Sequence, residues 1–452
     1  MLSDEVLEKV IDRLTDRINK GNEYIINEIG KSIGQLRTVT PSKAHQLGQL
    51  LKYGGSYEKI VKKLADITKL NTKEIYEIFD EVAKNDYEFA EKFYDYRDVD
   101  YIPYNEHSAL KKTVDAVAKI TADEYVNISQ TSAIGYVIKD SDGNLVLRNI
   151  KQAYYEMIDE AVLNVGTGKE TFDSALYRNL KQIGESGLRV FYPTTYVDKD
   201  GMVHQYTRRL DSAMKMNMRD GLMQLHNETQ MIFGEEFDAD GVEISVHANP
   251  ADDHADVQGR QFSKEEYEKL QTEGYAKDYK GNYVDMRRYS KKGNMSFRPI
   301  GEYNCYHKVF NVVLGVDDPE YSNEQLEKIN EENEQGFEFE GKHYTNYEGT
   351  QLQRRIETEI RKAKDNQIIG KASKNAPLVA ESQQRITQLT NKYRKLNKIS
   401  GLPDAISRAR VVNYKRVAKS KLMWYNIFVF LEILQLNNYL KFWWCYFLSS
   451  IE

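Results

Sequence analysis

The sequence predicts a predominantly α-helical α+β fold, and three observations lead to this prediction. Apolar residues recur at the three- and four-residue spacing of a helical face over long stretches of the chain. Proline, which interrupts helices, occurs only 8 times in 452 residues, whereas lysine and glutamate are abundant. Two pairs of short apolar segments, each joined by a turn rich in Asp and Gly, predict β-hairpins between the helices.

The N-terminal part of the chain is expected to be helical. Two apolar stripes carry the pattern, namely Leu7, Val10, Ile11, Leu14 and Ile18, and then Ile75, Ile78, Phe79 and Val82. Asn71 and Glu74 resemble a capping box, which predicts that a helix begins there. A turn is expected at 53–56, where two glycines follow a tyrosine. We interpret the stripes as core-facing surfaces rather than as partner-binding faces.

The middle of the chain combines helices with hairpins. The expected strands pair 134–138 with 145–147 and 194–197 with 202–206, and the expected helices cover 150–165 and 210–233. The sequence pattern changes near Gly241, where residues 242–246 alternate between apolar and polar as in a β-strand. From 274 to 301 the chain lacks a clear period, so loops and short strands are expected there.

Three further helices have start signals of the capping-box type, at Ser263, Ser322 and Thr345. The helix after Thr345 has an apolar seam, and a second helix ends at the Gly401-Leu402-Pro403 sequence. A short link between these two helices predicts an antiparallel pair. The expected regions are a helical one at 1–125, a helical one with two hairpins at 126–235, a loop-rich α+β domain at 236–320, a basic helical region at 321–420 and an atypical apolar tail at 421–452.

Charge is unevenly distributed along the chain. Residues 351–420 contain 17 Lys and Arg but only 5 Asp and Glu, a net charge of +12, whereas the first 350 residues contain 44 basic and 62 acidic residues. A basic segment on an acidic body can contact nucleic acid or an acidic protein, or can form a solvated helical surface. The candidate contact residues are Arg354, Arg355, Arg361, Lys362 and Lys364.

The two ends of the chain give different signals. The N-terminal sequence is charged and amphipathic and lacks the apolar core of a signal peptide, so folding in a cytosol is expected. Residues 422–448 are long enough to cross a bilayer, but polar residues such as Glu432 and Lys441 interrupt them. All three tryptophans lie in this segment. It is either a tail from an altered reading frame or a membrane or hydrophobic docking segment, and a membrane partner is not expected.

One cluster of residues could carry chemistry. Three of the eight histidines and one of the two cysteines lie within 61 residues, as His247-x6-His254 and Cys305-x-His307. Imidazole nitrogen and thiolate sulfur are ligands that zinc prefers, so the four residues are candidate ligands of a structural zinc ion. Cys-x-His is shorter than the usual spacing of such ligands, and hydrogen bonds in a loop-rich domain are the alternative. A metal-dependent hydrolase or nuclease built on this cluster is a further hypothesis.

We assign no catalytic residues and expect that the protein is not an enzyme. With only Cys305 and Cys445, no disulfide framework is expected either.

These residues resemble a known family. The segment His247 to Gly259, HANPADDHADVQG, is similar to an H-x6-H-x3-Q-G signature of phage minor capsid proteins related to Mu F-like head morphogenesis proteins. Asn304-Cys305-Tyr306-His307 resembles that family's Asn-Cys-x-His element. Blocks around 314–326 and 341–357 continue the likeness, which covers roughly 1–419. The sequence departs from the pattern at Ala251 and Tyr306, where many relatives have arginine.

The resemblance implies a structural protein of the virion, built into the head of a tailed bacteriophage in the host cytoplasm. The implied partners are the portal protein and a scaffold or major capsid protein, with packaged DNA as a further candidate. The basic helices at 351–420 are the expected contact surface.

Overall fold

The fold is known from a computed structural model. The described residues are 4–35, 56–97, 99–130, 133–139, 144–167, 172–197, 203–278, 280–286, 299–301, 305–412 and 414–417. The expected apolar tail after residue 420, the turn at 53–55 and the tips of the two hairpins lie outside them. Within them, the predominantly helical α+β prediction is confirmed.

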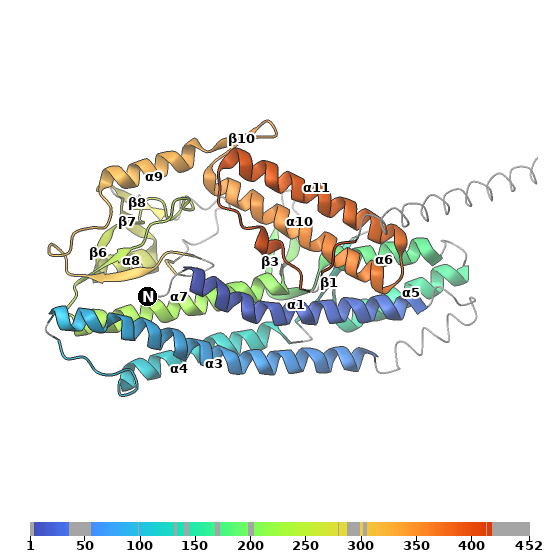
Figure 1. Cartoon of the computed structure of the whole chain (residues 1–452), viewed down its shortest axis with the longest axis horizontal. Helices are drawn as coiled ribbons and strands as arrows, with labels where there is room; N and C mark the ends of the chain where they lie inside the picture. Colours follow the sequence, from blue (N-terminus) through green and yellow to red (C-terminus); the bar gives the residue numbers. More distant parts are fainter. Residues whose placement is uncertain are drawn as a thin grey trace, which may run out of the picture.

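Long helices run side by side along the length of the molecule (Figure 1). They are α1 (Asp4–Gln35), α3 (Ser56–Arg97), α4 (Ser108–Ile128) and α7 (Leu210–Glu236). The predicted stripes face the core, since Ile11 and Leu14 of α1 and Ile75 and Phe79 of α3 are buried. Burial of these stripes against one another stabilises helices that would be marginal in isolation.

The predicted helix start at Asn71 is wrong, because α3 continues through it without interruption. Asn71 is fully buried, and its side-chain amide donates hydrogen bonds to the Leu14 carbonyl, at 3.3 Å, and to the Tyr125 hydroxyl. Glu74 accepts from Arg13, at 2.6 Å, and from Arg17. The polar pair therefore joins α3 to α1 and α4, and tertiary contacts replace the capping role that the local pattern indicated.

Both predicted hairpins are confirmed and form one antiparallel sheet in the order β2-β1-β3-β4. Its strands are β1 (Ile134–Lys139), β2 (Leu145–Asn149), β3 (Arg189–Val197) and β4 (Val203–Arg209). The helices α5 (Ile150–Thr167) and α6 (Phe172–Ser186) connect β2 to β3. Apolar residues of this sheet and of its helices share one hydrophobic cluster with the long helices. The regions expected at 1–125 and 126–235 thus contribute to the same core.

A smaller β-containing domain follows α7, with its own hydrophobic cluster. Its main sheet has the order β6-β5-β9 and consists of β5 (Gly241–Ile244), β6 (Gln261–Ser263) and β9 (Val309–Val312). Between β6 and β9 lie α8 (Lys264–Glu273) and the hairpin of β7 (Tyr275–Lys277) and β8 (Tyr283–Asp285). The capping box predicted at Ser263 is confirmed, and it begins α8.

The C-terminal helices pack against α1 and α6 of the helical part (Figure 1). After α9 (Asn323–Gln335) and the hairpin of β10 (Phe337–Phe339) and β11 (Lys342–Tyr344) come α10 (Asn346–Ala372), α11 (Ala376–Ser400) and the short 3-10 helix η3 (Ile406–Ala409). The capping boxes at Ser322 and Thr345 are confirmed, and Gly401 ends α11 with a φ of 68°. The predicted antiparallel pair is α10 and α11, which pack along their length.

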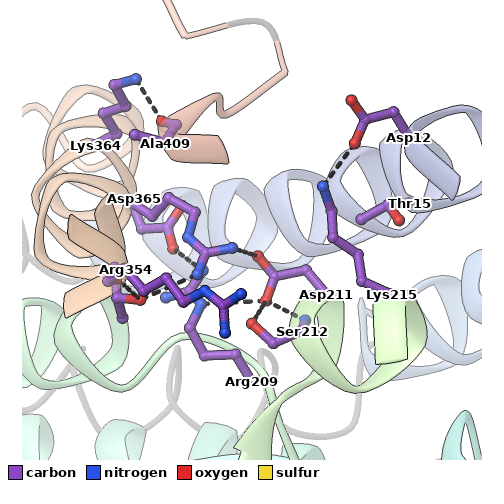
Figure 2. A network of polar contacts seen from close by, with 12 residues as sticks. Asp12, Thr15, Arg209, Asp211, Ser212, Lys215, Arg354, Lys364, Asp365 and Ala409 are labelled. Atoms are coloured by element: carbon purple, nitrogen blue, oxygen red, sulfur yellow. Dashed lines mark hydrogen bonds and ion pairs between the residues drawn. The ribbon is translucent and has the colours of Figure 1, made fainter. Parts of the chain in front are cut away.

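A network of buried ion pairs joins α10 to the rest of the protein (Figure 2). Arg209, the last residue of β4, donates to Asp365 of α10 at 2.9 Å and contacts Asp211 of α7 at 3.3 Å. Arg361 of α10 donates to the other oxygen of Asp211 at 2.8 Å. Three of these side chains are under 10% exposed and Arg361 is 12% exposed, so little solvent screens the charges.

Burial and pairing act in opposite directions on these carboxyl groups. Burial alone would raise the pKa of Asp211, but Arg361 and Arg209 outweigh it and hold that pKa below its ordinary value. For Asp365, burial dominates and raises the pKa, although the contact with Arg209 reduces the rise. Arg209 is thus the shared cation on which both carboxylates depend.

We expect the substitution Arg209→Met to lower the free energy of unfolding by about 3–5 kcal/mol, because it leaves two buried carboxyl groups without their common partner. Urea denaturation monitored by circular dichroism measures the change. The control Arg355→Met removes an exposed guanidinium from α10 and is expected to change stability by less than about 0.5 kcal/mol. Equal stabilities of the two variants would contradict the structural role of the network.

Candidate metal centre

Strand pairing brings the predicted His and Cys residues together. In the small domain β5 and β9 are antiparallel neighbours, with Ile244 opposite Val309. The segment that follows β5 and the segment that precedes β9 therefore meet at the same end of the sheet. Beyond this pair the Ser245 amide donates to the Lys308 carbonyl at 2.9 Å, which extends the contact toward the cluster.

Three of the four predicted ligands form a buried group. The ligand atoms of His254, Cys305 and His307 all lie within 4.8 Å of one another. The Cys305 sulfur is 3.6 Å from Nδ1 of His254 and 3.3 Å from Nδ1 of His307. Each side chain is less than 5% exposed. Residues separated by about fifty positions in the sequence thus share one small volume.

The two sulfur–nitrogen separations match those of a thiolate and an imidazole bound to one zinc ion. With zinc bonds of about 2.0–2.3 Å and tetrahedral angles, neighbouring nitrogen and sulfur ligands stand roughly 3.3–3.6 Å apart. The same distances also fit hydrogen bonds, in which the thiol donates to one imidazole and accepts from the other. The geometry is therefore suited to a metal and does not require one.

Neighbouring groups orient the two imidazoles with Nδ1 toward the sulfur. Nε2 of His307 lies 3.1 Å from Oε1 of Gln258, which also accepts from the His247 amide at 2.9 Å. A proton on Nε2 is favoured by this acceptor, which leaves Nδ1 of His307 with a lone pair for a ligand. On the outer side of His254, Nε2 faces a carboxylate oxygen of Asp253 at 4.0 Å.

The fourth predicted ligand, His247, lies beside the group of His254, Cys305 and His307 but is not part of it. Its ring packs edge-to-face against His307, with centroids 4.5 Å apart. The His254 segment is held by a turn in which the His254 amide donates to the Ala251 carbonyl at 2.9 Å. Gln258 was not among the predicted site residues, although it belongs to the Gln-Gly element that marked the segment.

The group opens on a cavity of about 290 Å³. One wall consists of residues 247–251 with His254, Cys305, Tyr306 and His307, and the other comes from α10 and from residues 403–408. The two positions that depart from the family pattern, Ala251 and Tyr306, both line it. The Tyr306 ring lies 4.4 Å from the guanidinium of Arg219, which belongs to α7.

The predicted basic contact residues have different environments. Arg361 is engaged in the internal ion-pair network, and Lys364 donates to the Ala409 carbonyl at 2.6 Å. Lys362 pairs with Glu359 on the same helix, at 2.7 Å. Arg355 is exposed, and Arg354 lines the cavity. Position within a basic segment could not distinguish an internal ion pair from a surface charge.

The molecule is a helical protein with a small domain at one end, and the His/Cys group of that domain is buried rather than exposed on a surface. Comparison with protein families gives a match over residues 2–397 to the family model described as Phage minor capsid protein 2. The chain belongs to this phage minor capsid protein family. No curated protein and no solved structure matched it.

Membership in this family implies a structural role in the phage capsid, and not an enzymatic one. It also implies a location in the virion and interactions with other phage structural proteins. Within the part of the chain that the structure describes, no helix has the length and apolar character needed to span a bilayer.

The loop that carries His254 depends on Gly259, and this dependence can be tested. Gly259 has a φ of +66°, and an added Cβ would lie 2.5 Å from Leu326 and 2.7 Å from Val246. We expect Gly259→Ala to destabilise the protein by more than the roughly 1–2 kcal/mol that left-handed strain alone costs. In the control Gly315→Ala the φ is +76° with open space around the Cβ, so only the strain applies. Thermal denaturation compares the two, and a smaller effect at Gly259 would contradict the tight packing.

Proposed function

We propose that the chain is a head morphogenesis protein that is assembled in the host cytoplasm, in association with the portal or the interior of the procapsid. Its partners would be the portal protein and a scaffold or major capsid protein, with packaged DNA as a further contact. The match to a phage minor capsid family over most of the chain carries this proposal. It lends no support to a metal-dependent hydrolase or nuclease.

Exposed cations on α10 and α11 support a contact with acidic protein or DNA. Arg394, Lys395 and Lys398 lie within about one turn at the end of α11, and all three are exposed. Arg355 is exposed at the same end of the pair, where Gln353 of α10 donates to Asn397 of α11 at 2.9 Å. We call these four residues the basic surface. The basic surface replaces the contact residues expected from the sequence, because Arg361 pairs with Asp211 and Lys364 donates to the Ala409 carbonyl.

Reversing the charge of Arg394, Lys395 and Lys398 together to Glu is expected to reduce incorporation into procapsids. If DNA is the partner, the triple variant should also lower the slope of log affinity against log salt by up to about 3, since each lost phosphate contact removes about 0.9. Quantitative mass spectrometry of purified particles and DNA titrations at several salt concentrations measure these effects. Charge reversal of Arg361 is unsuitable as a test, because it would disrupt the buried ion pairs.

A matched control is available on α3. Lys59, Lys62 and Lys63 are three exposed lysines within little more than one turn of α3, a helix that packs against α1, α4 and α7. Their reversal to Glu changes the net charge by the same amount, so incorporation should stay close to that of the unmodified protein. Equal losses for the two triple variants would mean that net charge, rather than the basic surface, controls incorporation.

We propose in addition that His254, Cys305 and His307 hold a structural zinc ion. The separation of the three ligand atoms and the orientation of His307 by Gln258 support this assignment. A zinc ion would join the chain segments that flank β5 and β9 at the edge of the small sheet. Its role would be to stabilise the domain by cross-linking these segments.

We expect purified protein to contain about one zinc per chain by elemental analysis, and the variant Cys305→Ala to contain almost none. A chelator should lower the melting temperature of the unmodified protein but not that of Cys305→Ala. The control His343→Ala removes an exposed histidine on β11, outside the cluster, and should retain the metal. A full-length, folded protein that contains no zinc after expression in zinc-supplemented medium would refute the assignment.

A further inference from the structure

We propose that the cavity beside the His/Cys group binds an acidic peptide segment of a second protein, whose carboxylate is held by Arg354 and Arg408. The origin of that peptide in a phage structural partner rests on the proposed function. The binding chemistry does not, and it is independent of whether zinc is present.

The cavity lies at the junction between two parts of the molecule. The small domain contributes the segment after β5 and the residues before β9, whereas α10 contributes Tyr347, Gln351 and Arg354. The segment after α11 completes it with Pro403, Ala405 and Arg408. Because four separate stretches of chain form the walls, the cavity exists only in the folded protein.

The lining has cationic but no acidic side chains. Arg354 and Arg408 both line the cavity and both are half-buried, and none of the described lining residues is Asp or Glu. Among the described residues neither guanidinium forms an ion pair. Partly desolvated guanidinium groups in a concave site favour an anionic ligand, because the field is less screened there than on an open surface.

One buried carboxyl group, that of Glu357, interacts electrostatically with both arginines. Burial raises the pKa of Glu357, while the charges of Arg408, Arg361 and Arg354 lower it. Arg361 is already paired with Asp211. If Glu357 is ionised it balances one of the two remaining arginines, so the cavity retains at least one positive charge. Glu357 also accepts from the Tyr393 hydroxyl, at 3.3 Å, and is turned toward α11.

Size and lining favour a peptide over DNA. A cavity of about 290 Å³ accommodates a side chain or a chain end, whereas duplex DNA presents its phosphates on a broad surface. The apolar part of the lining includes Ala248, Pro250, Ala251 and Ala405. Such a surface suits the methylene groups and apolar neighbours of an acidic residue.

The test uses the full chain and a fluorescein-labelled six-residue peptide made of glutamate and leucine, with fluorescence anisotropy as the measurement. We expect saturable binding that the double variant Arg354→Gln and Arg408→Gln weakens by at least about tenfold, since each lost hydrogen bond between charged groups is expected to contribute about that factor. The same peptide with glutamine in place of glutamate should bind correspondingly less well. The double variant should raise the dissociation constant of the peptide by the same factor with and without a chelator.

The matched control is Lys59→Gln with Lys62→Gln, which removes two exposed positive charges on α3, outside both the cavity and the basic surface. It should leave the dissociation constant within about twofold, as expected for surface charges screened by salt. The proposal is overturned if the peptide does not bind, if the control pair weakens binding as much as the cavity pair, or if a short oligonucleotide displaces the peptide at lower concentration. Because purified protein is used, these outcomes are separate from the incorporation test of the proposed function.

Discussion

The buried ion pairs around Arg209 are the constraint on which the arrangement of the molecule depends. Arg209 lies where β4 passes into α7, and through Asp365 it fixes the position of α10 against the core. Once these charges are desolvated, any displacement of α10 would separate them at a large energetic penalty. The fit around the guanidinium is close, because a Cβ at Gly187 would lie 2.3 Å from Nη1 of Arg209. Packing and charge together define one position of α10 against α1 and α6.

That position determines the geometry of the cavity. On α10, Arg354 precedes Arg361 by seven residues, which corresponds to about 10 Å along the helix axis. One half of the helix is therefore anchored in the core by Arg361 and Asp365, while the other half carries Arg354 and Tyr347 toward the His/Cys group. A single rigid helix thus connects the helical core to the site. The distance between the guanidinium of Arg354 and the imidazoles is fixed by contacts made two turns away.

Local signals in the sequence predicted local structure, and contacts between distant segments decided the rest. The helix starts at Ser263, Ser322 and Thr345 follow from side chains that bond to the backbone three residues away, so no tertiary information is needed. Asn71 shows the same pattern, but its amide is satisfied by α1 and α4, and α3 continues. In the same way, the composition of 351–420 predicted a basic segment but could not show that Arg361 has an internal partner on α7. The His and Cys residues were predictable as a group by their chemistry, whereas the pairing of β5 with β9 decided which of them meet.

The small size of the β-containing domain gives a reason for the cluster of His and Cys residues within it. Strands β6, β7 and β8 have three residues each, and their hydrophobic cluster is separate from the large core of the helical part. A core of this size contributes little stability, and such domains commonly depend on an additional cross-link. The contacts of Cys305 with His254 and His307 join the two chain segments that border β5 and β9, where the sheet itself ends. The same contacts hold the segments that form one wall of the cavity. Stability of the domain and the shape of the proposed binding site are therefore consequences of one set of interactions, whether a metal ion or protons hold the three side chains together.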